Sequence, residues 1–168
     1  MENLILFLAT SLVLRLPSAK KLKDHNIGNT GCRALLLPHA RGFAHTTSEG
    51  DKVFLQEFEE AKVGYGIICV QLHEQYCLDE ATQMLFNYME KLKGPFSIVH
   101  DLGVHQGEDW NSTQSRSLVD YWQDIENYDW KVKCYTDGRV LSVLYVKNIS
   151  QATVSRQDHF LDSFHFAA

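Results

Sequence analysis

Residues 130–149 constrain the fold more than any other part of the chain. Their first arm alternates apolar and polar side chains over residues 130–135, which is the two-residue period of a strand with one buried face. The second arm, residues 140–146, is apolar on both faces, as is typical of a central strand. Between the arms, Asp137-Gly138 predicts a tight type I′ turn, because glycine adopts positive φ without steric cost. We therefore expect a hairpin at the centre of a sheet.

A second pair of extended runs and one helix precede this hairpin. Residues 52–58 and 62–73 have the composition of strands, and the second run is again apolar on both faces. A helix is predicted by apolar residues that recur at three- and four-residue steps, namely Leu78, Ala81, Leu85, Met89 and Leu92. Gly94-Pro95 is expected to end the helix, with Gly94 forming a left-handed cap.

The remaining segments complete an α+β pattern. Residues 96–100 predict a short strand, apolar residues at helical spacing between Ser115 and Asn127 predict a second helix, and residues 153–164 predict a short third helix. The fold class expected from this order is α+β. It would be a mainly antiparallel, twisted sheet with two to three helices packed on it.

Composition divides the chain near residue 50. Residues 1–50 hold six Lys/Arg against three Asp/Glu, whereas residues 51–168 hold ten against eighteen. An acidic body argues against binding to nucleic acid or to an anionic membrane surface, since both require a basic face. We expect a leader, targeting or disordered segment over residues 1–50 and a single α+β domain over residues 51–168.

The basic first part has the composition of a targeting segment. Its apolar run, residues 4–14, is too short to span a bilayer, so no integral membrane segment is expected. The excess of Lys and Arg favours a mitochondrial presequence, and residues 41–46 resemble a mitochondrial processing site. Glu2 is atypical of a secretory signal. The alternatives are a secreted or periplasmic protein, a disordered leader, or translation from upstream of the true start.

One loop carries residue types that bind metals. Two imidazoles and three carboxylates lie within ten residues, namely His100, Asp101, His105, Glu108 and Asp109. Neutral imidazole and carboxylate are ligands for zinc and other divalent transition metals. Their spacing matches no established metal motif, and Gly103 and Gly107 make the loop flexible. His100, Asp101, His105 and Glu108 are the candidate ligands, and a solvated acidic loop is the alternative.

Two aromatic residues are candidate contacts for a ligand or protein partner. Trp110 lies in the polar loop, and Tyr121 lies in the aromatic-rich second half of the chain. No phosphate-binding loop, serine-centred elbow or His-Glu-x-x-His motif is present, and no cofactor is expected. Four cysteines lack Cys-x-x-Cys spacing, and we expect Cys69 and Cys134 to be small buried residues.

Four short motifs over residues 52–166 resemble the PsbP-like superfamily and related small bacterial envelope domains. They are VGYGIICVQL at 63–72, Leu78-Asp79-Glu80-Ala81, GRVLSVLYV at 138–146 and Phe160-Leu161-Asp162-Ser163-Phe164. The resemblance implies a PsbP-like layered domain that acts as a non-enzymatic accessory or binding module. It carries over no catalytic residues, and the polar 101–113 loop departs from the pattern.

Three functions follow as hypotheses. The first is a non-enzymatic accessory or binding domain for a small ligand or a protein partner. The second is a metal-dependent enzyme that uses the 100–109 loop, and the third is a structural subunit of a larger, organellar complex.

Overall fold

The computed structural model describes residues 22–37, 42–108 and 113–167. An eight-stranded antiparallel sheet has the order β3-β4-β5-β10-β9-β8-β6, with β7 also paired to β8. Its strands are β3 (Phe43–Thr46), β4 (Lys52–Glu60), β5 (Val63–Gln71), β6 (Ile98–Asp101), β7 (His105–Gln106), β8 (Arg116–Asp124), β9 (Asp129–Thr136) and β10 (Val140–Lys147).

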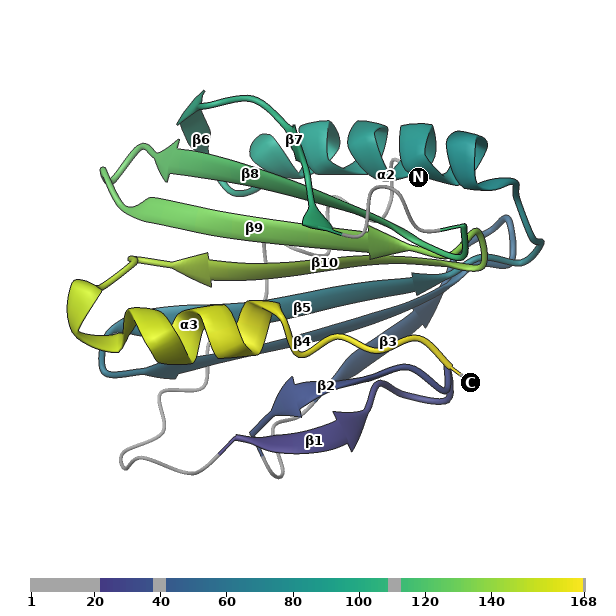
Figure 1. The fold of residues 1–168 in the computed structure, drawn as a ribbon, viewed down its shortest axis with the longest axis horizontal. Helices are drawn as coiled ribbons and strands as arrows, with labels where there is room; N and C mark the ends of the chain where they lie inside the picture. The colour runs from purple at the N-terminus through teal and green to yellow at the C-terminus, as the bar shows by residue number, and fades with distance from the viewer. Residues whose placement is uncertain (1–21, 38–41, 109–112, 168) are drawn as a thin grey trace.

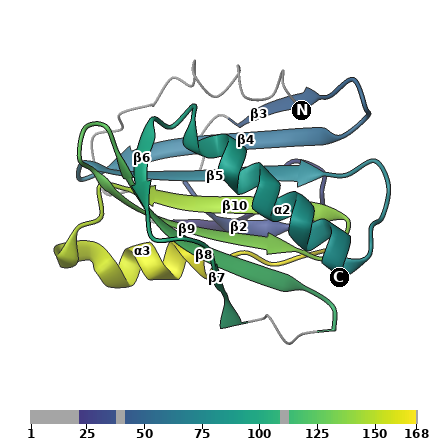
Figure 2. The same cartoon turned by 90° about the horizontal axis from the view of Figure 1, so that it is seen from above.

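Both faces of the sheet are covered. Helix α2 (Leu78–Lys93) lies across one face (Figure 1, Figure 2). The other face carries α3 (Val154–Leu161), which follows the short 3₁₀ helix η2 (Gln151–Thr153), and a two-stranded sheet of β1 (Lys23–Asn26) and β2 (Arg33–Leu36). The twisted antiparallel sheet with helices packed on it confirms the predicted α+β class. No helix in the described part of the chain is long and apolar enough to cross a membrane.

Strand β10 lies between β5 and β9, as expected for a strand that is apolar on both sides. Its odd-numbered residues from Leu141 to Tyr145 pack in the apolar cluster under α2, whereas Leu144 and Val146 pack in the cluster under α3 and the β1–β2 hairpin. The predicted central hairpin is therefore confirmed. Each face of β10 contributes to a separate apolar core.

The turn of this hairpin differs from the predicted type. Thr136 pairs with Leu141, so four residues form the turn, and Gly138 has φ 88° whereas Asp137 is not left-handed. The Asp137 carboxylate instead accepts the N–H groups of Arg139 and Val140, at 2.8 and 2.9 Å. The expected type I′ geometry, with positive φ at both central residues, was wrong because this side chain stabilises a wider turn.

The segment that we expected to be a second helix is strand β8. Side chains at Leu118, Asp120, Trp122 and Asp124 are buried in alternation. Two of these are aspartates, so the apolar residues alone did not show the two-residue period. Asp120 is buried because its carboxylate accepts the indole N–H of Trp122 at 2.6 Å. The helical prediction was wrong because a hydrogen-bonded carboxylate occupied an interior position.

Helix α2 has the predicted extent but a different end. Gly94 has right-handed dihedral angles, φ −60° and ψ −61°, so it forms no left-handed cap. The chain instead continues in turns, with Phe96 N–H donated to the Leu92 carbonyl, until Ser97 adopts φ 55°. Phe96 is thereby placed against Trp130 and Tyr145, with ring centroids 5.0 Å from each.

Ordered structure begins before Asp51, where we placed the start of the domain. The β1–β2 hairpin and the segments beside it bury Ile27, Cys32, Ala34, Leu36 and Leu37 in the cluster under α3. The C-terminal segment fastens the hairpin. Arg33 and His165 exchange backbone hydrogen bonds of 2.9 Å, and the Ser163 hydroxyl accepts the Leu35 N–H. The hairpin is thus part of the core, which composition alone did not reveal.

We predict that Leu36→Ala lowers the free energy of unfolding by about 2–5 kcal/mol, because Leu36 is 2% exposed within this core. Chemical denaturation of the full chain measures the effect. Leu102→Ala is the matched control, since Leu102 is 74% exposed and its truncation should change stability little. Equal stability of both variants would show that the hairpin is not part of the cooperative fold.

Candidate binding pocket

Two glycines leave one end of β5 bare on the face that carries α2. Side chains alternate along a strand, so Gly64 and Gly66 point to the same side as Ile68 and Val70, which are core residues of the α2 cluster. Gly64 therefore forms a floor without a side chain, and Gly66 leaves room beside it for a neighbouring ring. A glycine inside a strand is typical of a site where another group approaches the backbone closely.

Tyr145 crosses this floor to reach Glu57. Gly66 is the register partner of Tyr145 on one side and of Glu57 on the other. A Cβ at Gly66 would lie 2.1 Å from Cζ of Tyr145, so only glycine lets the ring lie there. The Tyr145 hydroxyl donates a hydrogen bond to Oε1 of Glu57. Burial, together with the Glu57 charge, raises the pKa of Tyr145 well above its ordinary value.

The second oxygen of Glu57 is a polar atom without a partner. Oε2 is buried and has no hydrogen bond to any residue that the structure describes. A buried carboxylate oxygen left in this state costs free energy that a donor from a ligand would recover. Glu57 therefore carries an unsatisfied acceptor at the edge of the pocket that it lines.

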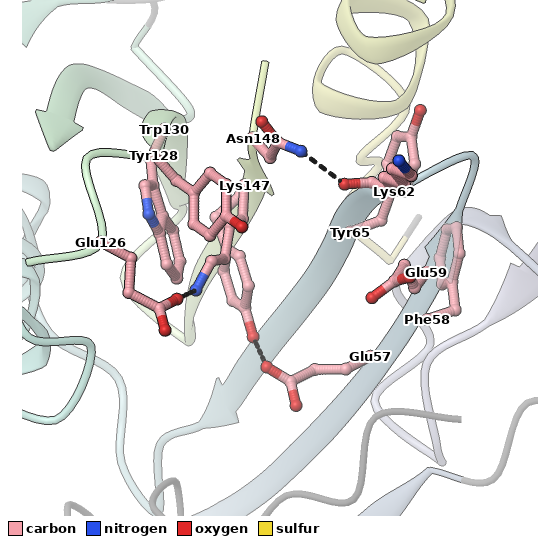
Figure 3. A pocket seen from close by; sticks show the side chains of 12 residues that line it. Glu57, Phe58, Glu59, Lys62, Tyr65, Glu126, Tyr128, Trp130, Lys147 and Asn148 are labelled. Carbon is pink, nitrogen blue, oxygen red and sulfur yellow. Dashed lines mark hydrogen bonds and ion pairs between the residues drawn. The ribbon is translucent and has the colours of Figure 1, made fainter. Parts of the chain in front are cut away.

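Lys147 forms the opposite wall (Figure 3). Its ammonium lies 5.1 Å from the ring centroid of Tyr128 and 5.2 Å from that of Trp130. The same Nζ is 3.1 Å from the Asp124 carboxylate and 3.5 Å from the Glu126 carboxylate. This wall holds a cation between aromatic faces and carboxylates, an arrangement that stabilises ammonium groups.

The two walls and the glycine floor enclose a cavity of about 620 Å³. Glu57 projects from β4 on one side, and Glu126, Tyr128, Trp130 and Lys147 stand on the other (Figure 3). The lining comprises Glu57, Phe58, Glu59, Lys62, Gly64, Tyr65, Glu126, Tyr128, Trp130, Tyr145, Lys147 and Asn148. Aromatic rings and charged groups of both signs thus face one opening.

Asp124 is buried behind the Lys147 wall and holds Lys147 and Trp130 in position. It is 2% exposed and accepts the Trp130 indole N–H at 2.9 Å and the Tyr128 backbone N–H at 3.0 Å. Burial alone would raise the pKa of the Asp124 carboxyl. The hydrogen bonds from Trp130 and Tyr128, together with Lys147, lower that pKa below its ordinary value. Asp124 therefore remains ionised and holds both the aromatic ring and the cation in position.

The predicted metal ligands do not converge. His100 pairs with Gln123 on β8 and His105 pairs with Val119, so the two histidines are separated by four residues of strand, roughly 13 Å. Asp101 instead forms an ion pair of 3.2 Å with Lys93. Glu108 follows β7 and is exposed. Among the described residues, no three His, Cys, Asp or Glu side chains form a group that could hold a metal ion.

The two predicted aromatic contacts have different outcomes. Trp110 lies outside the described residues. Tyr121 is 38% exposed and lines a groove of about 740 Å³ on the surface, together with His100, Asp101 and the exposed Leu102. The expectation that Tyr121 contacts a ligand or partner remains a prediction.

The pocket itself was not anticipated from the sequence, although a signal for it was present. Gly64 and Gly66 occupy alternate positions of an otherwise apolar strand, a spacing that leaves one face bare. Glu57 gave no signal, because it lies among other carboxylates in β4. Lys147 and Trp130 are 17 positions apart and meet only because β9 and β10 pair in register.

Comparison with known proteins bears on the fold. No protein-family model matches the chain, and no curated protein matches its sequence. Among solved structures, the solution structure of cyanobacterial PsbP (CyanoP) from Synechocystis sp. PCC 6803 is similar to it, with a TM-score of 0.56 and 14% sequence identity. The similarity covers 89% of this chain and 94% of that chain. The predicted resemblance is confirmed at the level of architecture: this chain has a PsbP-like fold.

We predict that Asp124→Asn lowers the free energy of unfolding at pH 7 by about 1–3 kcal/mol, since Lys147 loses a buried charged partner. The folded-state pKa of Asp124 is lowered, so its stabilisation is present above about pH 4, the unfolded value, and is lost as pH falls through the folded value. The difference in free energy of unfolding between the wild type and Asp124→Asn should become smaller from pH 4 to pH 2.

Urea denaturation across this pH range measures this difference. Glu108→Gln is the control, because Glu108 is an exposed carboxylate outside the pocket, and its stability should follow the wild type. A difference that stays constant down to pH 2 would contradict the assigned role of the Asp124 charge.

Proposed function

We propose that this protein is a non-enzymatic accessory module that binds a basic side chain of a protein partner in the pocket over Gly64. One observation carries the proposal. Oε2 of Glu57 is a buried acceptor without a partner among the described residues, and it belongs to a side chain that lines a cavity large enough for the end of a lysine or arginine. Ammonium and guanidinium groups are the strongest donors that proteins offer to a carboxylate.

The charges around the pocket support a cationic occupant. Glu57, Glu59 and Glu126 line it, against Lys62 and Lys147. Because Asp124 and Glu126 already compensate Lys147, the β4 side of the cavity is its acidic side. Residues 51–168 also carry eighteen acidic residues against ten basic ones, which favours encounter with a basic partner.

Lys147 illustrates how this wall accommodates a lysine ammonium group. Its ammonium already lies over two aromatic rings beside two carboxylates, so the chemistry of the wall suits a lysine head group. Tyr145 supports binding rather than proton transfer. Its raised pKa keeps the phenol protonated at neutral pH, as a fixed donor to Glu57.

The resemblance to PsbP-like domains supports the accessory role, since that architecture is the one shared with cyanobacterial PsbP. We further propose that a targeting segment, mitochondrial in preference to secreted, precedes β1. Its composition supports this, with Arg15, Lys20 and Lys21 among its basic residues. Processing near Arg41 would remove the β1–β2 hairpin from the core, so we place the end of the segment before Lys23.

The binding test uses two small probes that differ in one group. Nα-acetyl-lysine N-methylamide carries the ammonium, and Nα-acetyl-norleucine N-methylamide has the same alkyl chain without the ammonium. The lysine probe should shift the NMR signals of the Gly64 and Gly66 amides and of the Trp130 indole N–H in a saturable manner. Glu57→Gln should weaken its binding by about tenfold, because a charge-assisted hydrogen bond becomes a neutral one.

The control is again Glu108→Gln, which removes one negative charge outside the pocket and should bind the lysine probe as the wild type does. The proposal is wrong if both probes shift these signals equally, or if Glu57→Gln binds the lysine probe with unchanged affinity while remaining folded.

A further inference from the structure

Two buried cysteines meet where the N-terminal hairpin rests on the main sheet. Cys32 lies just before β2 and is 1% exposed, and Cys69 lies on β5 and is fully buried. Both thiols are free and both belong to the apolar cluster under α3. Neither contributes to the pocket, and Gly64 at its floor points to the opposite face of β5.

Backbone geometry holds the Cys32 segment over Cys69. The Ile27 N–H donates to the Cys32 carbonyl at 2.9 Å, which closes a loop, and the Thr30 hydroxyl accepts the Cys32 N–H at 3.1 Å. The same loop packs closely against the sheet at Gly28, where an added Cβ would lie 2.0 Å from the Phe54 ring.

Phe54 connects this loop to Cys69. It is the cross-strand partner of Cys69 in the β4–β5 register, and it packs against the same cluster. The loop that ends at Cys32 therefore lies directly above the Phe54–Cys69 pair. Cross-strand neighbours are about 5 Å apart, so the loop segment over Phe54 also lies beside Cys69.

The two thiols are chemically unequal. A hydrogen bond with the Cys69 thiol is the largest influence on Cys32 and, with the Ala167 N–H and the Thr30 hydroxyl, lowers the pKa of Cys32 to about 7 against the effect of burial. The interaction with Cys32, together with burial, raises the pKa of Cys69 well above its ordinary value. With the hairpin docked, Cys32 is thus the thiol of the pair that ionises more readily.

We propose that Cys32 and Cys69 form a disulfide that locks the β1–β2 hairpin onto the main sheet. The oxidant is a small disulfide such as oxidised glutathione, which reaches Cys32 before the hairpin has docked. The Cys32 thiolate attacks one sulfur of the oxidant, forms a mixed disulfide and releases one thiol. Cys69 then loses its proton and attacks Sγ of Cys32, which forms the Cys32–Cys69 bond and releases the second thiol. Two electrons pass to the oxidant.

The other two cysteines provide internal controls. Cys77 is exposed at the start of α2, and Cys134 is buried in the cluster under α2, on the other side of the sheet. The two core clusters are separated by the sheet itself, so neither of these thiols can replace a member of the pair in the folded protein. A specific disulfide should therefore exclude both.

The first test is peptide mapping of the full chain. The protein is refolded with oxidised and reduced glutathione, and free thiols are blocked with N-ethylmaleimide under denaturing conditions. The expected product contains a linked Cys32–Cys69 peptide, with Cys77 and Cys134 alkylated. Alkylation of all four cysteines, or linkage of Cys32 or Cys69 to another cysteine, would overturn the proposal.

The second test measures how much the disulfide raises the thermal stability of the protein. In a Cys77→Ser variant, oxidation should raise the Tm by roughly 5–10 °C relative to the reduced form, because the bond closes a loop of more than thirty residues. The shift should vanish in Cys77→Ser/Cys32→Ala. An equal Tm for the oxidised and reduced Cys77→Ser protein would contradict the lock. If the double variant does not fold, comparison of the two forms of Cys77→Ser decides alone.

Discussion

Burial of strand β10 on both faces is the constraint on which the rest of the molecule depends. Leu141 and Val143 face α2, while Leu144 and Val146 face α3 and the N-terminal hairpin, so neither layer has a core without this strand. The same strand continues into the pocket, because Tyr145 and Lys147 follow Val143 on the α2 face. The position of the pocket is therefore a consequence of how the sheet is built.

The sequence predicts what depends on local periodicity. Residues 130–149 have the period and composition of a central hairpin, and the helix at Leu78–Lys93 has its apolar stripe at the expected spacing. Both predictions succeeded because each element buries apolar residues in a regular pattern. The fold class followed from the order of such elements.

Prediction failed where polar groups are buried or where contacts are distant in sequence. Asp120 and Asp124 interrupt the apolar alternation of β8, and only their indole partners show why they lie inside. The β1–β2 hairpin is short and polar at its surface, and its burial depends on Ser163 and His165 at the far end of the chain. The pocket depends in the same way on the register of four strands.

The two faces of β5 support separate properties. The α2 face carries the glycine floor and the Tyr145–Glu57 hydrogen bond, and we assign ligand binding to it. The other face carries Cys69 and the docked hairpin, to which we assign a covalent lock. Since these features lie on opposite sides of the sheet, loss of the disulfide should leave the pocket in place.

The central claim is that the bare floor at Gly64 makes the binding site, and Gly64→Val tests it most directly. A Cβ at this position would lie 3.4 Å from Cβ of Lys147, an ordinary contact, and valine is favoured in strands. We predict a folded variant at least as stable as the wild type in which Nα-acetyl-lysine N-methylamide no longer shifts the Trp130 indole signal. A folded Gly64→Val protein that binds this probe with wild-type affinity would contradict the account.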